Sequence, residues 1–553
     1  MKARCAIVVG SMAMLAWTVQ ACDCGGGSDG LGDARAGVDT GPADTGGLVD
    51  DAGTRDGGLD AAVSEDVADA GADTGGEDIG PVDAGTPWVV VAPSGRYLMT
   101  TDGKPFVPLG NQPDSNTYLF DWPDWETALE AHFQRMQVYG ENTIRLDFDY
   151  SPGDEYIGVE SQVGVWNEAH LAKLLRAFEL ADTYGIRVLA VPFVTSPWMW
   201  PSWKKNPYST LVVDPYAFLQ SPEARKAYGN RMEELRDRFS NRGTLLGWDL
   251  MNEADVLLNW GAIPDKPSME IWISEIGNRV KNWESAAYGQ THLRMVSWSR
   301  TMGNDLNDDV PYNSLFQSPG LNCASTHPYD IYGSQPNLFP RSNGETFIGW
   351  NYDINDWGSM VQPAVKMNAN ITTILTNSNS NYIQDRRPYL EDERSPFDGM
   401  MPSFHTEVEH NFAWAELTSG SAGAGINWIE TNKSPWFEPY GSESLGPFHL
   451  RTAVNHRAIK AFVEAIPVKF FLGTTTDEAF STALTSPDSA VKVMSVRRGS
   501  YAIGWIPSLN ERCSMVQSIQ EMRQEVNGGK DILDLIYGPW GLVLWMKLLG
   551  NEG

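Results

Sequence analysis

The stretch that decides the fold is Leu245-Leu246-Gly247-Trp248-Asp249-Leu250-Met251-Asn252-Glu253, an almost continuous apolar run that ends in a polar pair. Apolar residues at successive positions are typical of a parallel strand that is covered on both faces. Seven other runs also read as strands, several of them nearly continuous apolar runs, and amphipathic stretches with helical spacing separate most of them. The eight strand-like runs are residues 105–110, 142–148, 186–193, 245–251, 293–298, 321–327, 388–393 and 424–429, and the helix-like stretches include residues 168–184, 222–239, 268–284, 356–378, 409–420 and 452–465.

Alternating strands and helices build a parallel sheet, and eight such units predict an α/β fold, a (β/α)8 TIM barrel, over residues 87–468. A doubly wound open sheet would give a similar pattern. However, no glycine-rich phosphate loop follows the first run, which disfavours a nucleotide-binding sheet. In a barrel, the chemistry lies at the carboxyl ends of the strands. We therefore expect functional side chains where these runs end.

The fourth run ends in Asn252-Glu253, which places an acid at such a position. Hydrolysis of a glycosidic bond needs one carboxylic acid to protonate the leaving oxygen and one carboxylate to attack or to activate water. The alternative is that Glu253 is a surface loop residue. Polar or aromatic side chains recur in three further runs: Asn142-Thr143-Ile144-Arg145, His327-Pro328-Tyr329 and Gly423-Ala424-Gly425-Ile426-Asn427-Trp428.

Together these motifs resemble the clan A glycoside hydrolases, particularly the cellulases and mannanases of glycoside hydrolase family 5. The resemblance implies that Glu253 is the general acid/base and that Asn252 contacts the sugar 2-hydroxyl. It further implies that Arg145 supports the nucleophile, that His327 and Tyr329 line the site, and that Trp428 forms a floor for the sugar. On structural grounds alone, Arg145 could be a surface charge, and His327 and Trp428 could be core residues.

The nucleophile of that family is a glutamate at the end of strand seven, five residues after a proline. Two segments have this spacing, Pro388 to Glu393 and Pro402 to Glu407. We choose Glu393 because it follows a long helical stretch, and we keep Glu407 as the alternative. Glu391 is a third candidate, because residues two apart lie on the same face of a strand.

The first 22 residues resemble a bacterial lipoprotein signal peptide. Lys2 and Arg4 precede a short apolar run, which ends in Val19-Gln20-Ala21-Cys22. The resemblance implies that Cys22 is acylated and that the protein is lipid-anchored in the bacterial cell envelope, at the outer membrane or cell surface, with ordinary secretion as the alternative. Residues 23–86 are rich in Asp, Gly and Ala and contain no aromatic residue, so we expect a disordered linker.

The charge and residue composition limit the partners. The net charge is -30, without a basic patch, so a nucleic acid would be repelled. The 21 tryptophans suit a protein that binds polysaccharide or oligosaccharide, because aromatic faces stack on sugar rings. No cluster of metal ligands is apparent, so we expect no metal and no cofactor. We also expect a monomer that meets the membrane only through its N-terminal lipid.

Residues 469–553 are expected to form a short C-terminal β-rich segment. Residues 490–497 and 500–506 predict a β-hairpin across Arg498-Gly499. The sequence after Glu511 departs from this strand pattern and ends in an interrupted apolar stretch at residues 532–549. We interpret this stretch as a truncated or frame-shifted C-terminus, and a second membrane anchor is the less favoured alternative. The leading hypothesis is a retaining hydrolase of β-linked polysaccharide, of the β-glucan or β-mannan class. The alternative is a surface carbohydrate-binding pseudoenzyme.

Overall fold

The parallel sheet of the protein is seen in a computed structural model. All of the described residues belong to the second of the two units into which the chain divides, Asp78–Gly553. The structure describes residues 85–113, 120, 123–150, 155–194, 202–254, 266–298, 318–327, 337–340, 346–349, 371, 387–390, 402–429, 446–473, 494–498, 501–507, 530–538 and 541–548. The predicted signal peptide and almost all of the predicted linker lie outside these residues, as does most of the helix predicted at residues 356–378.

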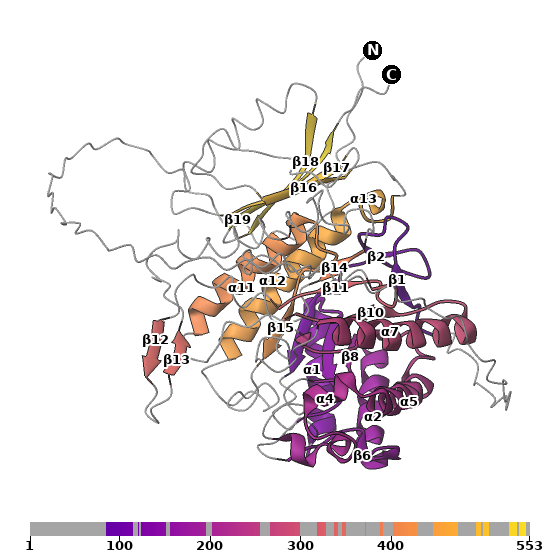
Figure 1. Cartoon of the computed structure of the whole chain (residues 1–553). Coiled ribbons are helices and arrows are strands. Elements are labelled where there is room, and N and C mark those ends of the chain that lie inside the picture. Colours follow the sequence, from indigo (N-terminus) through magenta and orange to yellow (C-terminus); the bar gives the residue numbers. More distant parts are fainter. Residues whose placement is uncertain are drawn as a thin grey trace, which may run out of the picture. The chain divides into compact units, whose positions relative to one another are not determined.

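Six parallel strands form the central sheet in the order β10-β9-β8-β5-β4-β15. Figure 1 labels β8, β10 and β15 of this sheet. The last of the six strands along the chain pairs with the first, with Ile426 opposite Gly110. The α/β fold with a parallel sheet is therefore confirmed. The six strands are β4 (Gly110–Pro113), β5 (Thr143–Asp147), β8 (Arg187–Val191), β9 (Leu245–Asp249), β10 (Leu293–Met295) and β15 (Ile426–Ile429).

Two further strands, β11 (Ala324–Ser325) and β14 (Tyr389–Leu390), pair with each other in parallel. Backbone hydrogen bonds connect this pair to the central sheet on both sides. The Asn322 N–H donates to the Arg294 carbonyl at 3.0 Å, and the Ala422 N–H donates to the Tyr389 carbonyl at 2.9 Å. The eight predicted runs thus correspond, in chain order, to β4, β5, β8, β9, β10, β11, β14 and β15.

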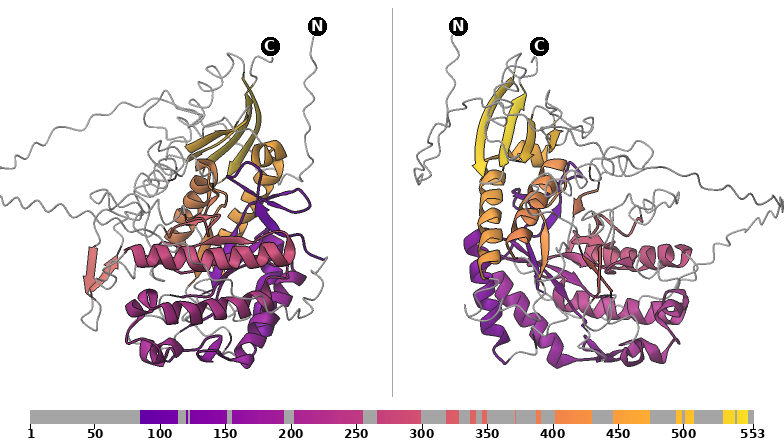
Figure 2. Two further views of the ribbon diagram at one scale, coloured as in Figure 1. Left: turned by 45° about the vertical axis from the view of Figure 1, so that its right-hand side comes forward. Right: turned by 90° about the vertical axis from the view of Figure 1, so that its left-hand side faces the viewer.

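Helices that follow the strands pack beside one another around the sheet (Figure 2). α12 contacts both α11 and α1, α1 contacts α2, and α5 contacts α7. Side-chain caps fix two of the helix starts: Asn167 accepts the His170 N–H at the start of α2, and Ser221 accepts the Ala224 N–H at the start of α5. The long helices are α1 (Trp125–Tyr139), α2 (Glu168–Thr183), α5 (Pro222–Phe239), α7 (Lys266–Tyr288), α11 (Pro402–Ser419) and α12 (Gly446–Ala465), and the short ones are η3 (Ser202–Lys205), η4 (Pro207–Thr210), α4 (Pro215–Gln220) and α13 (Val468–Leu472).

The two faces of the sheet have different side chains. Trp248 of β9 points towards the helices, because its indole N–H donates to Glu284 of α7 at 3.1 Å. Successive side chains of a strand alternate between faces, so Asp249 points to the opposite side. There it meets Arg145 of β5 at 2.6 Å. The inner face of the sheet therefore carries buried charge, while apolar packing is concentrated between the sheet and the helices.

The first predicted run, residues 105–110, is not a single strand. Its beginning is β3 (Pro105–Phe106), which pairs antiparallel with β2 (Leu98–Thr100), and β2 pairs with β1 (Val89–Val91). The chain joins the parallel sheet only near Leu109, whose carbonyl accepts the Asn142 N–H at 2.8 Å. Both halves of the run are buried, so the apolar pattern gave no sign of the break between them.

A buried polar cluster lies near the residues that lead into β9 and β10. Glu284 accepts hydrogen bonds from Ser240 at 2.8 Å and from the His292 backbone N–H at 2.9 Å, and the His292 Nδ1 lies 3.0 Å from the same carboxylate. Burial opposes ionisation of Glu284, but the charge of His292 and these hydrogen bonds outweigh it and lower its pKa to about 2. Trp88, which directly precedes β1, stacks on His292, with ring centroids 3.9 Å apart. This contact attaches the segment that leads into β1 at the end of the sheet opposite Asn252-Glu253.

The predicted C-terminal hairpin is confirmed as β16 (Met494–Arg498) and β17 (Tyr501–Pro507), which pair antiparallel and contact α11. The expectation that the β pattern stops there is wrong. β18 (Lys530–Gly538) and β19 (Gly541–Leu548) extend the sheet, and its strand order is β16-β17-β19-β18. Figure 1 labels all four strands. Most of the apolar stretch at residues 532–549 therefore forms strands. Among the described helices, none is long and apolar enough to cross a membrane. The remaining strands form two hairpins, β6 (Glu160–Gln162) with β7 (Val165–Trp166) and β12 (Asn337–Pro340) with β13 (Thr346–Gly349).

Candidate active site

Glu253 stands in a tight turn at the carboxyl end of β9. Its backbone has a φ of 48°, in the left-handed region that non-glycine residues adopt at a cost of about 1–2 kcal/mol. Neighbouring strands hold the turn on both sides. The Asn252 N–H donates to the Phe193 carbonyl after β8 at 2.9 Å, and the Ala254 N–H donates to the Ser297 carbonyl after β10 at 3.1 Å. These bonds maintain a conformation that the side chain itself disfavours.

The Glu253 carboxyl group pairs with His327, although the two residues are far apart in the sequence. His327 follows β11, and its Nδ1 lies 3.0 Å from Glu253 Oε1. His327 is completely buried, whereas the Glu253 side chain is 20% exposed. The imidazole can donate Nδ1–H to a Glu253 carboxylate or accept a proton from the neutral acid. The pair can therefore hold Glu253 in either protonation state, which is what an acid/base residue requires.

Arg145 is the centre of the polar network beneath Glu253. It is fully buried and donates to Gln112 Oε1 at 2.6 Å, Asp249 Oδ2 at 2.6 Å and Asn252 Oδ1 at 2.5 Å. A buried arginine needs such partners, because an unpaired charge inside a protein is strongly destabilising. The network fixes the Asn252 amide next to Glu253. Arg145 therefore acts through its neighbours, and it is not a surface charge.

The structure brings together four of the predicted site residues: Arg145, Asn252, Glu253 and His327. Trp428 lies in β15, where its backbone is opposite Gln112, but its side chain is not among those described. Glu393 and Tyr329, together with the third candidate Glu391 and the predicted lipidation site Cys22, lie outside the described residues.

The alternative nucleophile segment, residues 402–407, is not a strand. It forms the beginning of α11, so the alternative that placed the end of strand seven at Glu407 is wrong. The strand that pairs with β11 is β14, and β14 ends at Leu390. Glu393 follows that strand by three residues.

Asp249 and Ser297 are site residues that the sequence analysis missed. Asp249 Oδ2 accepts the Ser297 hydroxyl at 2.8 Å, and Asp249 Oδ1 accepts the Ser297 backbone N–H at 3.0 Å. A signal for Asp249 was present, because a charge within a buried strand implies a buried partner. Arg145 in the second strand had the same signal, so the two could have been paired. No comparable signal marks Ser297.

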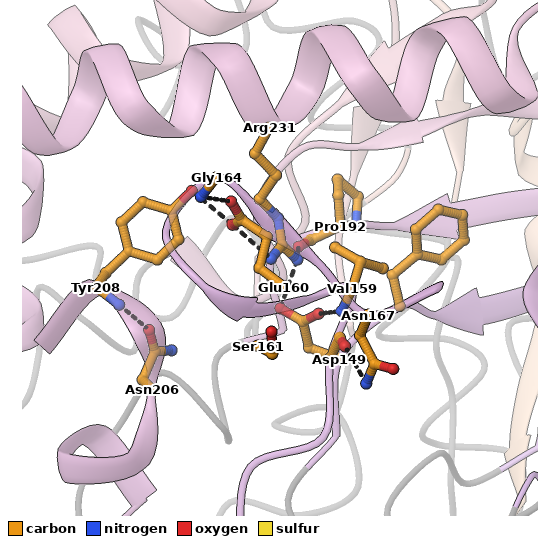
Figure 3. Close-up of polar contacts among 12 residues, drawn as sticks. Asp149, Val159, Glu160, Ser161, Gly164, Asn167, Pro192, Asn206, Tyr208 and Arg231 are labelled. Carbon is orange, nitrogen blue, oxygen red and sulfur yellow. Dashed lines mark hydrogen bonds and ion pairs between the residues drawn. The ribbon is translucent and has the colours of Figure 1, made fainter. Parts of the chain in front are cut away.

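A second buried ion cluster braces the segments that follow β5 and β8 (Figure 3). Arg231 of α5 donates to Asp149 Oδ2 at 2.6 Å, to the Pro192 carbonyl at 2.8 Å and to Glu160 Oε2 at 3.3 Å. Burial alone would lower the pKa of Arg231, but Asp149 and Glu160 hold that pKa well above its usual value. The Tyr208 hydroxyl donates to the same Glu160 oxygen at 2.9 Å. The cluster thus attaches β6 and η4 to the sheet close to the strand ends that carry Glu253.

The described side chains do not contain a metal centre. Among them, no three or more His, Cys, Asp or Glu residues are grouped so that they could hold an ion. The site as described offers acid/base chemistry and hydrogen bonding.

The comparisons with known proteins give matches among solved structures, all at low identity. No protein-family model matches the sequence, and no curated protein is significantly similar to it. The chain is similar to the solved structure of a glycoside hydrolase family 5 mannosidase from Rhizomucor miehei, with a TM-score of 0.46 and 13% identity over 69% of this chain and 98% of that one. It is also similar to a β-mannanase from the blue mussel Mytilus edulis, with a TM-score of 0.41 and 12% identity over 68% and 97% of the chains. For an endo-β-1,4-mannanase from Thermotoga petrophila, the TM-score is 0.43 and the identity is 12% over 73% and 84%. Because these values are low, the function is inferred from the residues of the site.

Proposed function

We propose that the protein is a retaining glycoside hydrolase that cleaves β-linked polysaccharide of the β-glucan or β-mannan class. The observation that carries the proposal is the partly exposed carboxyl of Glu253, held in a left-handed turn at a strand end and paired with buried His327. Strained backbone at a strand end is typical of catalytic positions. We further propose that the eight parallel strands close into a (β/α)8 barrel, which is supported by the hydrogen bonds that link β11 and β14 to the central sheet.

In the proposed reaction, Glu253 gives its proton to the leaving glycosidic oxygen while the Glu393 carboxylate attacks the anomeric carbon. The glycosidic bond breaks and an ester bond forms between the sugar and Glu393. Water then gives a proton to Glu253 and attacks the same carbon, which releases the Glu393 carboxylate. Retention of configuration requires the two carboxyl groups to lie about 5–5.5 Å apart.

The substrate-binding roles follow the same proposal. Asn252 contacts the sugar 2-hydroxyl, Trp428 stacks on the ring, and His327 and Tyr329 line the cavity. Arg145 supports this arrangement from below. Its hydrogen bonds to Asn252 and Asp249 support a positioning role, because its fully buried guanidinium has no surface of its own to offer a substrate.

The decisive experiment incubates the purified full chain with β-mannan, β-glucan and xylan and measures released reducing ends. Glu253→Gln should lower the rate by about 10²–10⁴-fold while sugar binding persists, because the variant keeps the shape but loses the proton. Glu179→Gln, at an exposed position of α2, is the matched control and should behave as wild type. Proton NMR of the first product anomer tests retention.

Two results would contradict the proposal. Unchanged activity of Glu253→Gln would remove Glu253 from the chemistry. Glycan binding by the wild type without any released sugar would favour the carbohydrate-binding pseudoenzyme instead.

We also propose that acylation of Cys22 anchors the protein as a monomer in the cell envelope. The basis is the signal-like sequence before Cys22. Membrane fractionation of the wild type and Cys22→Ser tests this, and the variant should move to the soluble fraction.

A further inference from the structure

Ser297 occupies the space between the turn of Glu253 and the buried ion pair beneath it. It follows β10 and is fully buried. Its hydroxyl oxygen lies 3.1 Å from the Glu253 backbone nitrogen and 2.8 Å from Asp249 Oδ2. Its carbonyl also accepts the Ala254 N–H at 3.1 Å. One serine therefore contacts both sides of the residue in the left-handed turn.

The direction of these hydrogen bonds follows from the donors present. The backbone N–H of Glu253 can only donate, so the Ser297 hydroxyl oxygen accepts from it. That leaves the single hydroxyl hydrogen for an acceptor. Asp249 Oδ2 at 2.8 Å is closer than Asn252 Oδ1 at 3.4 Å, so the hydrogen goes to Asp249. Asp249 is in turn fixed by Arg145 at 2.6 Å, which makes the hydroxyl a rigid acceptor.

Glu253 is thus held at two points. His327 holds the carboxyl end of the side chain, and Ser297 holds the backbone from which the side chain starts. A rotation of the backbone at the turn would displace the carboxyl group by much more than it displaces the backbone nitrogen. In an active site, a displacement of about 1 Å can reduce the rate by about 10²-fold.

We infer that Ser297 is a positioning residue that sets the backbone of Glu253 and thereby aims its carboxyl group at the glycosidic oxygen. The inference rests on the proposed function. Ser297 acts through Glu253 and does not touch the substrate, so its removal should impair proton transfer selectively and leave sugar binding largely intact.

The test uses two substrates that differ in their need for a proton. The glycan, or an oligosaccharide of the same class, has a poor leaving group that must be protonated. A 2,4-dinitrophenyl glycoside of the same sugar leaves without protonation. For Ser297→Ala we expect kcat on the glycan to fall by about 10- to 100-fold with little change in KM. The kcat/KM for the dinitrophenyl glycoside, which reports bond cleavage, should fall by less than about threefold, by the same reasoning.

Two further variants give the comparison its controls. Ser297→Thr retains the hydroxyl and should recover most of the glycan activity lost in Ser297→Ala. Ser240→Ala is the matched control, because Ser240 is equally buried and also donates to a carboxylate, that of Glu284 at 2.8 Å, but lies at the other end of the sheet. It should keep wild-type kcat on both substrates. If Ser297→Ala does not fold, Ser297→Cys replaces it, and its weaker thiol hydrogen bonds should give a smaller loss confined to the glycan.

The outcomes separate this inference from the proposed function. If the wild type is active and Ser297→Ala matches Ser240→Ala, the positioning role is overturned while the hydrolase proposal stands. Equal losses on both substrates would also overturn it, because they indicate general damage to the site. If the wild type cleaves neither substrate, the proposed function fails and this inference fails with it.

Discussion

Acidification provides a quantitative test of the polar cluster around Glu284. We predict that replacing this residue, Glu284→Gln, removes a specific part of the acid sensitivity of the fold. The carboxylate accepts hydrogen bonds from Ser240, Trp248 and His292, and its pKa is lowered from 4.5 to about 2. A group with a depressed pKa in the folded state stabilises the protein above its unfolded pKa. That contribution is lost as the pH falls towards the folded value.

The size of the effect follows from the two pKa values. A shift from 4.5 to about 2 corresponds in full to about 3 kcal/mol of unfolding free energy. Integrating the linkage between pH 5 and pH 3 gives a loss of about 2 kcal/mol, because the unfolded chain binds the proton over this range and the folded chain largely does not. The conversion is justified because Glu284 is fully buried.

The assay is urea unfolding followed by tryptophan fluorescence at pH 5, 4 and 3. Many carboxylates titrate in this range, so the informative quantity is the difference in unfolding free energy between the wild type and Glu284→Gln. That difference should shrink by about 2 kcal/mol from pH 5 to pH 3. Glu168→Gln is the control. The hydrogen bond and charge of Arg238 also lower the pKa of Glu168, but the Glu168 carboxylate is exposed, so the difference between Glu168→Gln and the wild type should change much less.

A difference between the wild type and Glu284→Gln that stays constant over this pH range would refute the reasoning. It would mean that the carboxylate binds protons equally in the folded and unfolded states. The hydrogen bonds to Glu284 would then not favour its charged form.

Two further predictions concern stability. Arg231→Met should lower the unfolding free energy by about 3–5 kcal/mol, because it leaves Asp149 and Glu160 buried without their cation. Chemical denaturation measures this loss. The double variant Arg231→Met with Asp149→Asn should recover part of it, because one of the two unpaired charges is removed. Gly247→Ala should cost about 1–3 kcal/mol, because its Cβ would lie 2.6 Å from the Leu293 backbone oxygen of the adjacent strand; an unchanged melting temperature would show that β9 and β10 can move apart.

Much of the sheet could be predicted because strands covered on both faces consist of apolar runs. The run at residues 245–251 contains β9, and that at residues 186–193 contains β8. The position of Glu253 at a strand end followed from the same pattern, because this acid comes just after the fourth run. Its proximity to His327 followed only from the order of the strands and the resemblance to a known family.

The remaining features depend on contacts between distant segments. Residues 105–110 are apolar throughout, yet they cross from one sheet to another, and hydrophobicity is the same on both sides of that crossing. In the tail, β19 inserts between β17 and β18, an order that no local signal encodes. Ser297 is a common residue type, and no local sequence pattern marks its position. Its hydrogen bonds to Glu253 and Asp249 form only when β10 lies beside β9.

The left-handed turn at residue 253 has a consequence for engineering. Glycine adopts this backbone conformation without a penalty, so optimisation for thermal stability alone would favour glycine over glutamate at position 253. A Glu253→Gly protein that is more heat-resistant but inactive would show a trade-off at this position. The chain would lose folding free energy by keeping an acid in a backbone conformation that favours glycine.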